Sequence, residues 1–520
     1  MHEATERESI SRVEPSSKIK AVVILTCLVA LLAVVSVIVR STQTTENGLF
    51  SDDSFYMLSV SRSIAQGHGP TVDGKTPTNG FQPLFAFICS VPFLLFHSDL
   101  ANVRAACVIC ACFFFATGAL LGSIARESVR ETLSPASANY LYLLTFALYV
   151  GSTFVFFTNF NGLETCSVLF LYAAAWRYYQ KFALTTFLQA VGFGCILGLL
   201  VLARIDAAFF VAVVCLVLLM RGHRTPLSAR FSRALIVGLT ALIISSPWWI
   251  YNVRSFGSLM PISGKAEQKW ALDPSRVVAA VKALVLQAAP QLYTGYRATF
   301  IATLVRVAIV GFVIVTLFRS RKMSRSVSME RAATFGGCIL VTTLLFVGWY
   351  TASSWATHFY NRYFAVVSLL AVVAFAMALR QISPGGRAGA TVAVVTTMLL
   401  CASVVCLQKG WVYQRCLQRV NQLPMVARYV PANEAVGAGQ SGALGFFRAN
   451  VVNLDGKVNP NVPHARGQVP QYLHKLGVNW FCDNVTYSHD LLGDQPDHIG
   501  WHKYADDGEV QLYHWTGAPE

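Results

Sequence analysis

The segment SDDSFYMLSVSRSIAQGHGPTVDGKTPTNGFQPLF, residues 51–85, follows the first strongly apolar run of the chain. It begins with two adjacent acids, Asp52 and Asp53, and the next basic residue is Arg62. Ionisable groups close to hydrocarbon are costly, and they usually mark a functional site. A short acid can also simply cap the helix that follows it. The segment therefore predicts either a reactive carboxylate or a helix cap where the first span leaves a bilayer.

The composition is that of a polytopic membrane protein. Of 520 residues, 54% are hydrophobic and only 13% are charged, whereas soluble domains are about a quarter charged. The formal net charge is +15, but the basic residues lie in short loops between apolar runs, as membrane topology requires. No nucleic-acid partner is therefore expected. Most of the cysteines lie inside apolar runs, and the sequence leaves open whether Cys416 and Cys482, the two in the C-terminal region, form a disulfide.

Eleven apolar runs are long enough to span a bilayer, which takes about 17–25 residues. A shorter run, 82–97, contains Pro92 and is interpreted as a helix on the outer membrane surface. The first run is expected to stay in the protein because it has no cleavage site of the signal-peptide type. The predicted spans lie near 21–40, 103–125, 138–158, 163–179, 184–203, 205–220, 232–250, 298–318, 332–350, 363–379 and 388–407.

Charge decides the orientation of these spans. If 82–97 does not cross, every loop on the side of the N-terminus is basic, which is the positive-inside pattern. We therefore expect a plasma-membrane protein with a cytoplasmic N-terminus. An amphipathic helix near 54–66 would then pair with 82–97 at the outer surface, because Phe55, Leu58 and Ile64 lie near one of its faces. The loops expected inside are 1–20, 126–136, 177–183, 221–231, 319–331 and 380–387.

The chain is predicted to have two domains, a membrane domain at 1–407 and an extracytoplasmic domain at 408–520. Beyond residue 407 the composition shifts to Asn, Gly, His, Asp and Pro. The strand-like runs ANVVNL and GVNWFC alternate there with the helix-like QYLHKL. This alternation is typical of a small α/β domain.

Under this topology, polar residues that interrupt the apolar pattern gather on the outer side. They lie in NFNGLET (159–165), LARIDAA (202–208), the stretch from Asn252 to Lys265, and HFYNRYF (358–364). Acids and cations that meet at one membrane face suggest chemistry on an anionic, lipid-borne substrate. Each residue also has a structural explanation, because Arg and Lys at helix ends commonly extend to lipid headgroups.

Several of these motifs resemble those of the GT-C superfamily, multi-span glycosyltransferases that use polyprenyl-phosphate-linked sugars. DDSFYMLSVSRSIAQGHGP and PTNGFQPL resemble the first outer loop of that superfamily. NGLET, LARIDA and SFGSLMPISGK resemble motifs of a bacterial branch, as does VVNLDGKVN in the tail. The resemblance implies an all-α GT-C membrane domain of about eleven transmembrane and two juxtamembrane helices, followed by the small α/β domain.

The resemblance also implies a reaction. The first-loop acid would be the base that takes the acceptor's proton, a role carried onto Asp52, while Asp53 orients substrate or shares the role. Direct displacement would invert the anomeric centre. The donor is expected to be a polyprenyl-phosphate sugar, and the acceptor a glycan, a lipid or a protein.

The remaining candidates follow from charge and position. Arg and Lys bind a lipid phosphate by charge-assisted hydrogen bonds without a metal. Arg204 either forms a structural pair with Asp206 or clamps the phosphate, and Arg306, inside the eighth span, either contacts the phosphate or extends to the surface. A divalent ion on Asp52, Glu164 and a further acid is a second possibility. The phosphate-binding candidates are Arg204, Arg254, Lys265, Arg306 and Arg362, and the substrate-binding candidates are His68, Asn79, Glu164, Asp206 and His358.

Two other classes of protein fit parts of the pattern. A transporter or flippase of a lipid-linked glycan would also have many spans, but it should show repeat symmetry between its halves, and none is seen. A non-catalytic scaffold would leave the Asp52–Asp53 segment unexplained. The sequence does not indicate the sugar, the acceptor or the oligomeric state.

Overall fold

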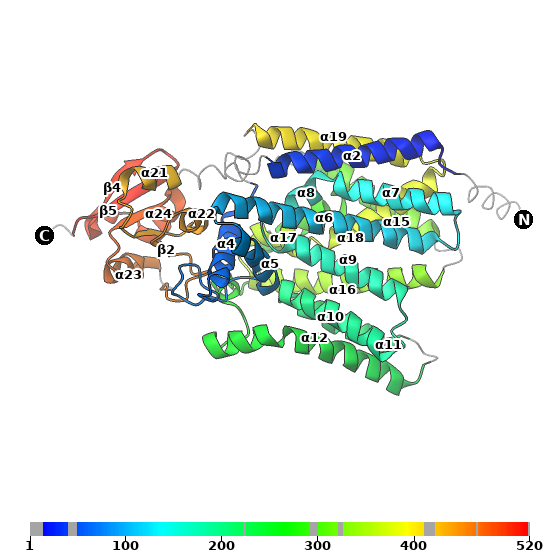
Figure 1. Cartoon of the computed structure of the whole chain (residues 1–520), viewed down its shortest axis with the longest axis horizontal. Helices are drawn as coiled ribbons and strands as arrows, with labels where there is room; N and C mark the ends of the chain where they lie inside the picture. Colours follow the sequence, from blue (N-terminus) through cyan, green and yellow to red (C-terminus); the bar gives the residue numbers. More distant parts are fainter. Residues whose placement is uncertain are drawn as a thin grey trace, which may run out of the picture.

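The computed structural model describes residues 14–39, 49–221, 225–290, 300–320, 326–409, 422–463 and 466–517. A large bundle of helices is followed by a small domain that contains a β-sheet (Figure 1). The small domain lies at one end of the bundle, and the start of α2 lies at the opposite end. The predicted fold class, a helical membrane domain with a C-terminal α/β domain, is confirmed.

Each of the eleven predicted spans coincides with a helix or with a bent pair of helices. Two pairs are bent, α7 with α8 by 65° and the η1–α17 segment with α18 by 52°. Within the described residues, five helices are long and apolar enough to cross a membrane, or up to seven if each bent pair is one span. The predicted number of eleven spans is therefore not confirmed. The helices are α2 (Ser17–Val39), α6 (Asp99–Val129), α7 (Pro135–Val150), α8 (Thr153–Asn159), α9 (Thr165–Lys181), α10 (Phe187–Ala203), α11 (Ala207–Met220), α12 (Leu227–Phe256), α15 (Phe300–Ser320), α16 (Val327–Ser353), η1 (Thr357–Phe359), α17 (Tyr360–Tyr363), α18 (Val367–Ile382) and α19 (Arg387–Gln408).

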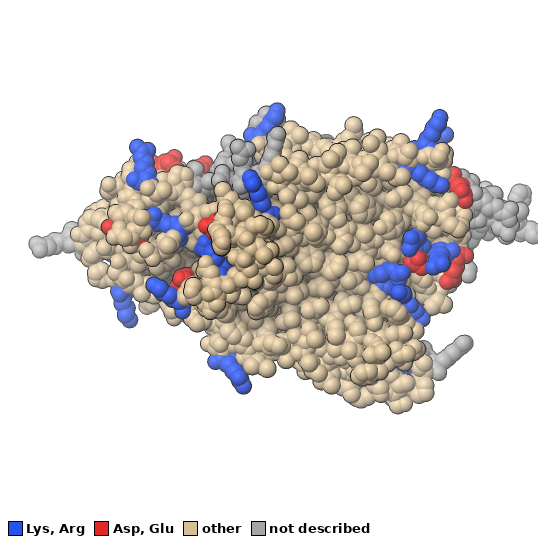
Figure 2. Space-filling model, in the orientation of Figure 1, with Lys and Arg blue, Asp and Glu red and all other residues tan. Residues whose placement is uncertain are grey.

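The surface of the bundle has the apolar character that a bilayer requires. Large apolar side chains point outward from several helices, among them Leu32 on α2, Leu242 on α12 and Leu344 on α16. In Figure 2 the Lys and Arg side chains gather at the two ends of the molecule, and the face between them carries almost no charge. A bundle with an uncharged belt and charged ends is a multi-pass membrane domain.

The two juxtamembrane helices are present. They are α4 (Asp52–Ala65) and α5 (Pro83–Leu95), which pack on each other. Pro83 occupies the first turn of α5, where its missing N–H is not needed and its fixed φ favours the helix. Both helices lie at the end of the bundle that faces the small domain (Figure 1).

The loop after α12 contributes two more helices to this end. Gly257 ends α12 in the left-handed region, at φ +62°, a conformation that only glycine adopts without strain. The chain then forms α13 (Ile262–Ala266) and α14 (Pro274–Ala288). Backbone bonds fix this loop to the end of α16, because Lys269 N–H donates to the Ser353 carbonyl at 2.7 Å.

The C-terminal domain is built on a five-stranded sheet of order β2-β1-β3-β5-β4. The β2, β1 and β3 strands run parallel, while β5 is antiparallel to both β3 and β4. The predicted run ANVVNL contains β2, GVNWFC contains the first half of β3, and QYLHKL contains most of α23. The elements are α21 (Gln422–Tyr429), β1 (Val436–Ala438), α22 (Gly442–Phe447), β2 (Val451–Asn453), η2 (Arg466–Gln468), α23 (Val469–Lys475), β3 (Trp480–Asn484), α24 (Val485–Leu492), η3 (Pro496–Ile499), β4 (Trp501–Asp506) and β5 (Val510–Trp515).

Residues 410–421 lie outside the described residues. The predicted domain boundary at 407 stays a prediction. The possible disulfide also falls outside, because Cys416 is not described, while Cys482 is buried on β3.

Candidate active site

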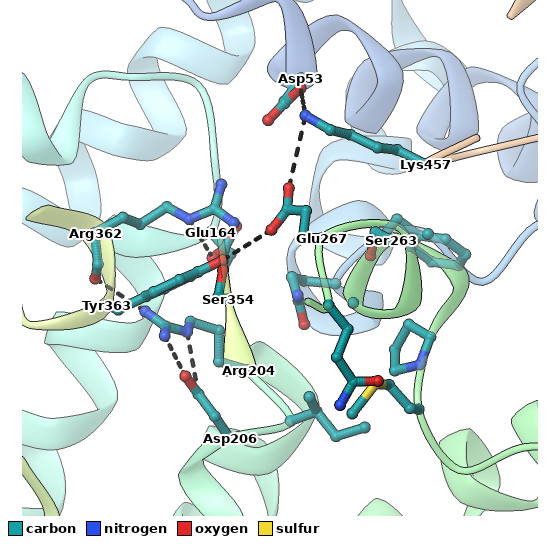
Figure 3. Close-up of a pocket in the computed structure, with 18 of the residues that line it drawn as sticks. Asp53, Glu164, Arg204, Asp206, Ser263, Glu267, Ser354, Arg362, Tyr363 and Lys457 are labelled. Atoms are coloured by element: carbon teal, nitrogen blue, oxygen red, sulfur yellow. Dashed lines mark hydrogen bonds and ion pairs between the residues drawn. The ribbon is translucent and has the colours of Figure 1, made fainter. Parts of the chain in front are cut away.

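A cavity of about 570 Å³ lies where the helical bundle meets the C-terminal domain. Its polar wall comes from α4, the NGLET loop, the α10–α11 turn, the α13 loop, α17 and the loop after β2 (Figure 3). Four carboxylates and three cations line it among the described residues: Asp53, Glu164, Asp206, Glu267, Arg204, Arg362 and Lys457.

The two acids of the opening segment point to different places. Asp53 lines the cavity, and its Oδ1 lies 3.5 Å from Lys457 Nζ. Asp52 is buried away from the cavity lining, and its two carboxylate oxygens accept hydrogen bonds from the backbone N–H groups of Gly442 and Ala443, at 2.9 and 3.0 Å. Successive residues on a helix point about 100° apart, so the two carboxylates leave α4 in different directions. Of the pair, Asp53 is the one that lines the cavity.

Lys457 enters the cavity from the C-terminal domain. Its ammonium lies between Asp53 and Glu267, with Nζ 3.6 Å from Glu267 Oε1 (Figure 3). Burial alone would lower the pKa of Lys457, but Asp53, Asp455 and Glu267 raise it, so the side chain stays charged. Burial raises the pKa of Glu267, an effect that the charge of Lys457 opposes.

Arg204 lines the cavity, but each of its three guanidinium nitrogens contacts a protein oxygen. It ends α10 in an extended conformation, and two residues later Asp206 starts α11. Its Nε and Nη2 both contact the Asp206 carboxylate, and its Nη1 donates to the Arg362 carbonyl at 2.9 Å. Tyr350 donates to the same Asp206 carboxylate at 2.6 Å. This geometry is that of a structural pair that fixes the backbone of Arg362.

Arg362 lies on the cavity wall with a less complete set of partners. Its Nε is 3.6 Å from Glu164 Oε1, beyond hydrogen-bond distance, and both atoms are buried without a hydrogen bond to the described residues. The ring of Tyr363 lies between the two guanidinium groups, 5.7 Å from that of Arg362 and 5.0 Å from that of Arg204 (Figure 3). A buried guanidinium nitrogen without a hydrogen bond is a natural contact for an anionic ligand oxygen.

The sequence motifs create this geometry locally. Gly162 of NGLET has φ +74°, and a side chain there would collide with Phe50 and Ser54. The glycine therefore lets the loop pack on the start of α4, with the Ser51 N–H bonded to the Asn161 carbonyl. Glu164 then begins α9 with its carboxylate in the cavity.

The predicted residue Asn79 does not line the cavity, but it fixes the loop that follows α12. It is fully buried, donates to Asn252 at 3.1 Å and accepts from the Ile262 N–H at 3.0 Å. Asn79 thus connects the PTNGF segment to α12 and α13, whose residues Ser263, Gly264 and Glu267 reach the lining.

Several other candidates do not reach the described lining of the cavity. His68, Arg254, Lys265 and His358 are exposed elsewhere. Arg306 is buried on α15, also outside the lining. From the predicted set, the structure therefore brings together Asp53, Glu164, Arg204, Asp206 and Arg362 in the lining of the cavity. The three exposed basic and histidine side chains of the loops, His358 and Arg306 lie outside this lining. The structure adds Glu267, Tyr363 and Lys457, of which Tyr363 lies in the motif HFYNRYF and Lys457 in VVNLDGKVN, although neither residue was itself predicted.

The residues do not fit the suggested divalent metal centre. Asp52 is bonded to the C-terminal domain, and Glu164 faces Arg362 rather than a second acid. Within the described residues, no three His, Cys, Asp or Glu side chains are grouped as a metal ion needs.

Comparisons with solved structures identify the fold. The chain is similar to ArnT from Cupriavidus metallidurans bound to undecaprenyl phosphate, with a TM-score of 0.63 and 11% identity over 96% of this chain and 99% of the other. It is also similar to the Archaeoglobus fulgidus oligosaccharyltransferase in complex with Zn and sulfate, with a TM-score of 0.53 and 12% identity over 95% of this chain and 73% of the other.

These similarities cover almost the whole chain, and they confirm the predicted GT-C fold. No sequence-family model matches the chain, and no curated protein matches it in sequence.

Proposed function

We propose that this protein is a membrane glycosyltransferase that moves a sugar from a polyprenyl-phosphate donor to an extracytoplasmic acceptor, with inversion at the anomeric carbon. The observation that carries this proposal is one cavity, in a GT-C fold, lined by a carboxylate on α4, the buried Arg204 and the half-buried Arg362. ArnT, of similar fold, was solved with undecaprenyl phosphate bound, and this supports the same donor class here.

Asp53 is the proposed base. Of the two acids in the opening segment it is the one whose carboxylate lines the cavity, so the role expected for Asp52 passes to its neighbour. The acceptor hydroxyl would transfer its proton to Asp53 as its oxygen forms a bond to the anomeric carbon. The bond from that carbon to the phosphate oxygen breaks, and its electron pair leaves with the polyprenyl phosphate.

Arg362 is the proposed phosphate ligand on the bundle side. Its Nε makes no hydrogen bond to the described residues, and Glu164 and the Tyr363 ring hold the guanidinium in place. The planar guanidinium offers two parallel donors to phosphate oxygens. Arg204 supports this arrangement through its bond to the Arg362 backbone.

The apolar part of the lining suits a lipid chain. Phe209, Trp249 and Trp349 line the cavity on the side of the membrane helices. A pocket that is charged at one end and aromatic at the other matches a phosphate attached to an isoprenoid.

The proposed location is the plasma membrane, with the cavity and the C-terminal domain on the outer side. The basic loops at the opposite end of the bundle support this orientation. The cavity does not favour a transporter over an enzyme. A transporter is expected to have two equivalent halves, whereas the ionic groups that line this cavity come from several unrelated helices and loops.

The test of this function is transfer itself. Purified protein in proteoliposomes is incubated with polyprenyl-phosphate sugars and with an extract of envelope glycans, lipids and proteins as the source of acceptor, and the release of polyprenyl phosphate is followed by mass spectrometry. The proposal expects release by the wild type and none by Asp53→Asn. Binding without release for every sugar offered, together with movement of the donor across the bilayer, would favour the transporter instead.

A further inference from the structure

Lys457 belongs to the C-terminal domain, yet its ammonium lies inside the cavity of the membrane domain (Figure 3). We propose that Lys457 is a second ligand of the donor phosphate, and that Asp52 and the glycine at 442 position it by docking the C-terminal domain on α4. The proposal rests on the proposed function and assigns part of the phosphate site to the soluble domain.

The distances around Lys457 suit a cation that changes partners. Its Nζ lies 3.5 Å from Asp53 and 3.6 Å from Glu267, both longer than the roughly 2.7–2.9 Å of a tight charge-assisted bond. Two carboxylates thus share one cation. When a phosphate enters the cavity, Lys457 can turn to it while Glu267 stays beside the ammonium and Asp53 gives up its share of the cation.

This exchange has a consequence for Asp53. With Lys457 turned to the phosphate, the Asp53 carboxylate has less positive charge beside it and accepts a proton more readily. Donor binding would therefore prepare the base for the acceptor, and the donor would bind first.

The charge of the phosphate group changes during transfer. The sugar-linked donor is a phosphodiester with one negative charge, and the departing polyprenyl phosphate is a monoester with roughly 1.5 to 2 negative charges at neutral pH. A cation beside the phosphate is therefore bound more tightly by the leaving group than by the donor. Such a cation lowers the barrier as well as helping to bind substrate.

The interface that holds Lys457 in the cavity leaves little freedom. The α22 helix lies directly against α4, with its first N–H groups on the Asp52 carboxylate. A side chain on Gly442 would overlap the Asp52 carbonyl, and one on Gly80 would overlap the Lys457 carbonyl. Two surfaces that meet at glycine backbones cannot shift without breaking these contacts.

Tyr56 adds a polar network one helical turn after Asp52. Its hydroxyl accepts from the Ser441 N–H at 3.1 Å and from Asn453 at 2.9 Å, and it donates to Asp455 at 3.2 Å. Asp455 in turn accepts from the backbone N–H of Lys457 at 2.8 Å. A continuous chain of bonds therefore connects α4 to the backbone of the proposed phosphate ligand.

The experiment measures the affinity of the full-length protein in nanodiscs for undecaprenyl phosphate. Lys457→Met should weaken binding about tenfold or more, the effect of losing one charge-assisted contact, and Lys457→Arg should retain most of the affinity. Lys457→Met should weaken the binding of a phosphodiester analogue by a smaller factor, because a phosphodiester carries only one negative charge. Thermal unfolding of each variant checks that the protein is intact.

The docking part of the proposal has a matched pair of variants on α22. Gly442→Ala should weaken binding, because the added methyl group collides with α4, whereas Gly445→Ala, whose nearest neighbour would be Val451 at 3.7 Å, should not. If docking acts through Lys457, the double variant Gly442→Ala/Lys457→Met should bind no more weakly than Lys457→Met alone.

These measurements distinguish a failure of the role proposed for Lys457 from a failure of the proposed function. Tight binding by wild type and Lys457→Met, with loss in Arg362→Ala, would overturn the role of Lys457 and leave the proposed function standing. No binding by wild type would overturn both. Equal affinities for Gly442→Ala and Gly445→Ala, or fully additive losses in the double variant, would overturn the docking role.

Discussion

Replacing Asp52 by Asn separates a docking role from a catalytic one. The two are close in size, but Asn offers one carbonyl oxygen where Asp52 offers two carboxylate oxygens to Gly442 and Ala443. One backbone N–H of α22 would then face an NH₂ group. We therefore expect Asp52→Asn to loosen the C-terminal domain from α4, and Asp53→Asn, one residue away, to leave it docked.

The magnitude follows from the two bonds. A hydrogen bond to a charged group contributes roughly 1.5–3 kcal/mol, and Asp52 is 3% exposed, so solvent screens it little. Losing one bond and the charge on the other should cost about 2–4 kcal/mol of docking free energy. Since each 1.4 kcal/mol is a factor of about ten, local opening should become roughly 30- to 700-fold more frequent.

Hydrogen exchange followed by mass spectrometry measures this opening directly. Peptides covering α22 should exchange faster in Asp52→Asn, while peptides in the core of α6 should be unchanged. Wild-type protection of α22 in Asp52→Asn would refute the docking assignment. If that variant also had no transfer activity, the catalytic base would be Asp52, as the sequence alone suggests, and not Asp53.

Three further outcomes are expected. Arg204→Lys replaces three nitrogen contacts by one ammonium, so the melting temperature and the affinity for undecaprenyl phosphate should fall together; weaker binding at an unchanged melting temperature would mean that Arg204 contacts the phosphate itself. Burial raises the pKa of Asp455 from 3.8 to about 6, so the folded protein disfavours the ionised form and its stability should fall as pH rises from about 4 to 6; thermal unfolding of Asp455→Asn should lack this dependence, and an unchanged slope would contradict the assignment. Cysteines introduced at 319–331 should resist an impermeant label applied from outside, whereas those in 66–76 should react; the reverse pattern would invert the topology.

The membrane domain was predictable because its signal is local. Each apolar run forms a helix, and each motif at the outer ends of these runs lies near the end of a helix in the structure. The NGLET and LARIDA motifs reach the same cavity because the spans that carry them pack side by side. Composition alone also separated the C-terminal domain from the bundle.

The details of the site depend on tertiary contacts that cannot be predicted from the sequence pattern. Asp52 and Asp53 are chemically identical neighbours, and the rotation of α4, set by its packing on α22 and α5, decides which one enters the cavity. Glu267 follows a predicted loop motif by two residues, but only the bonds between that loop and α16 turn it inward. Lys457 is about 400 residues from Asp53 along the chain, and no periodicity connects them.

The proposed mechanism depends on the role of Asp53 as the base that accepts the acceptor's proton during sugar transfer from a polyprenyl phosphate. It is tested most directly by mass spectrometry of envelope glycans and polyprenyl-phosphate sugars from cells without this protein, complemented with wild type or with Asp53→Asn at equal expression. In cells without the protein, one glycan component should be missing and its polyprenyl-phosphate donor should accumulate, and wild type alone should restore the normal pattern. Full restoration by Asp53→Asn, or no glycan difference without the protein, would contradict this mechanism.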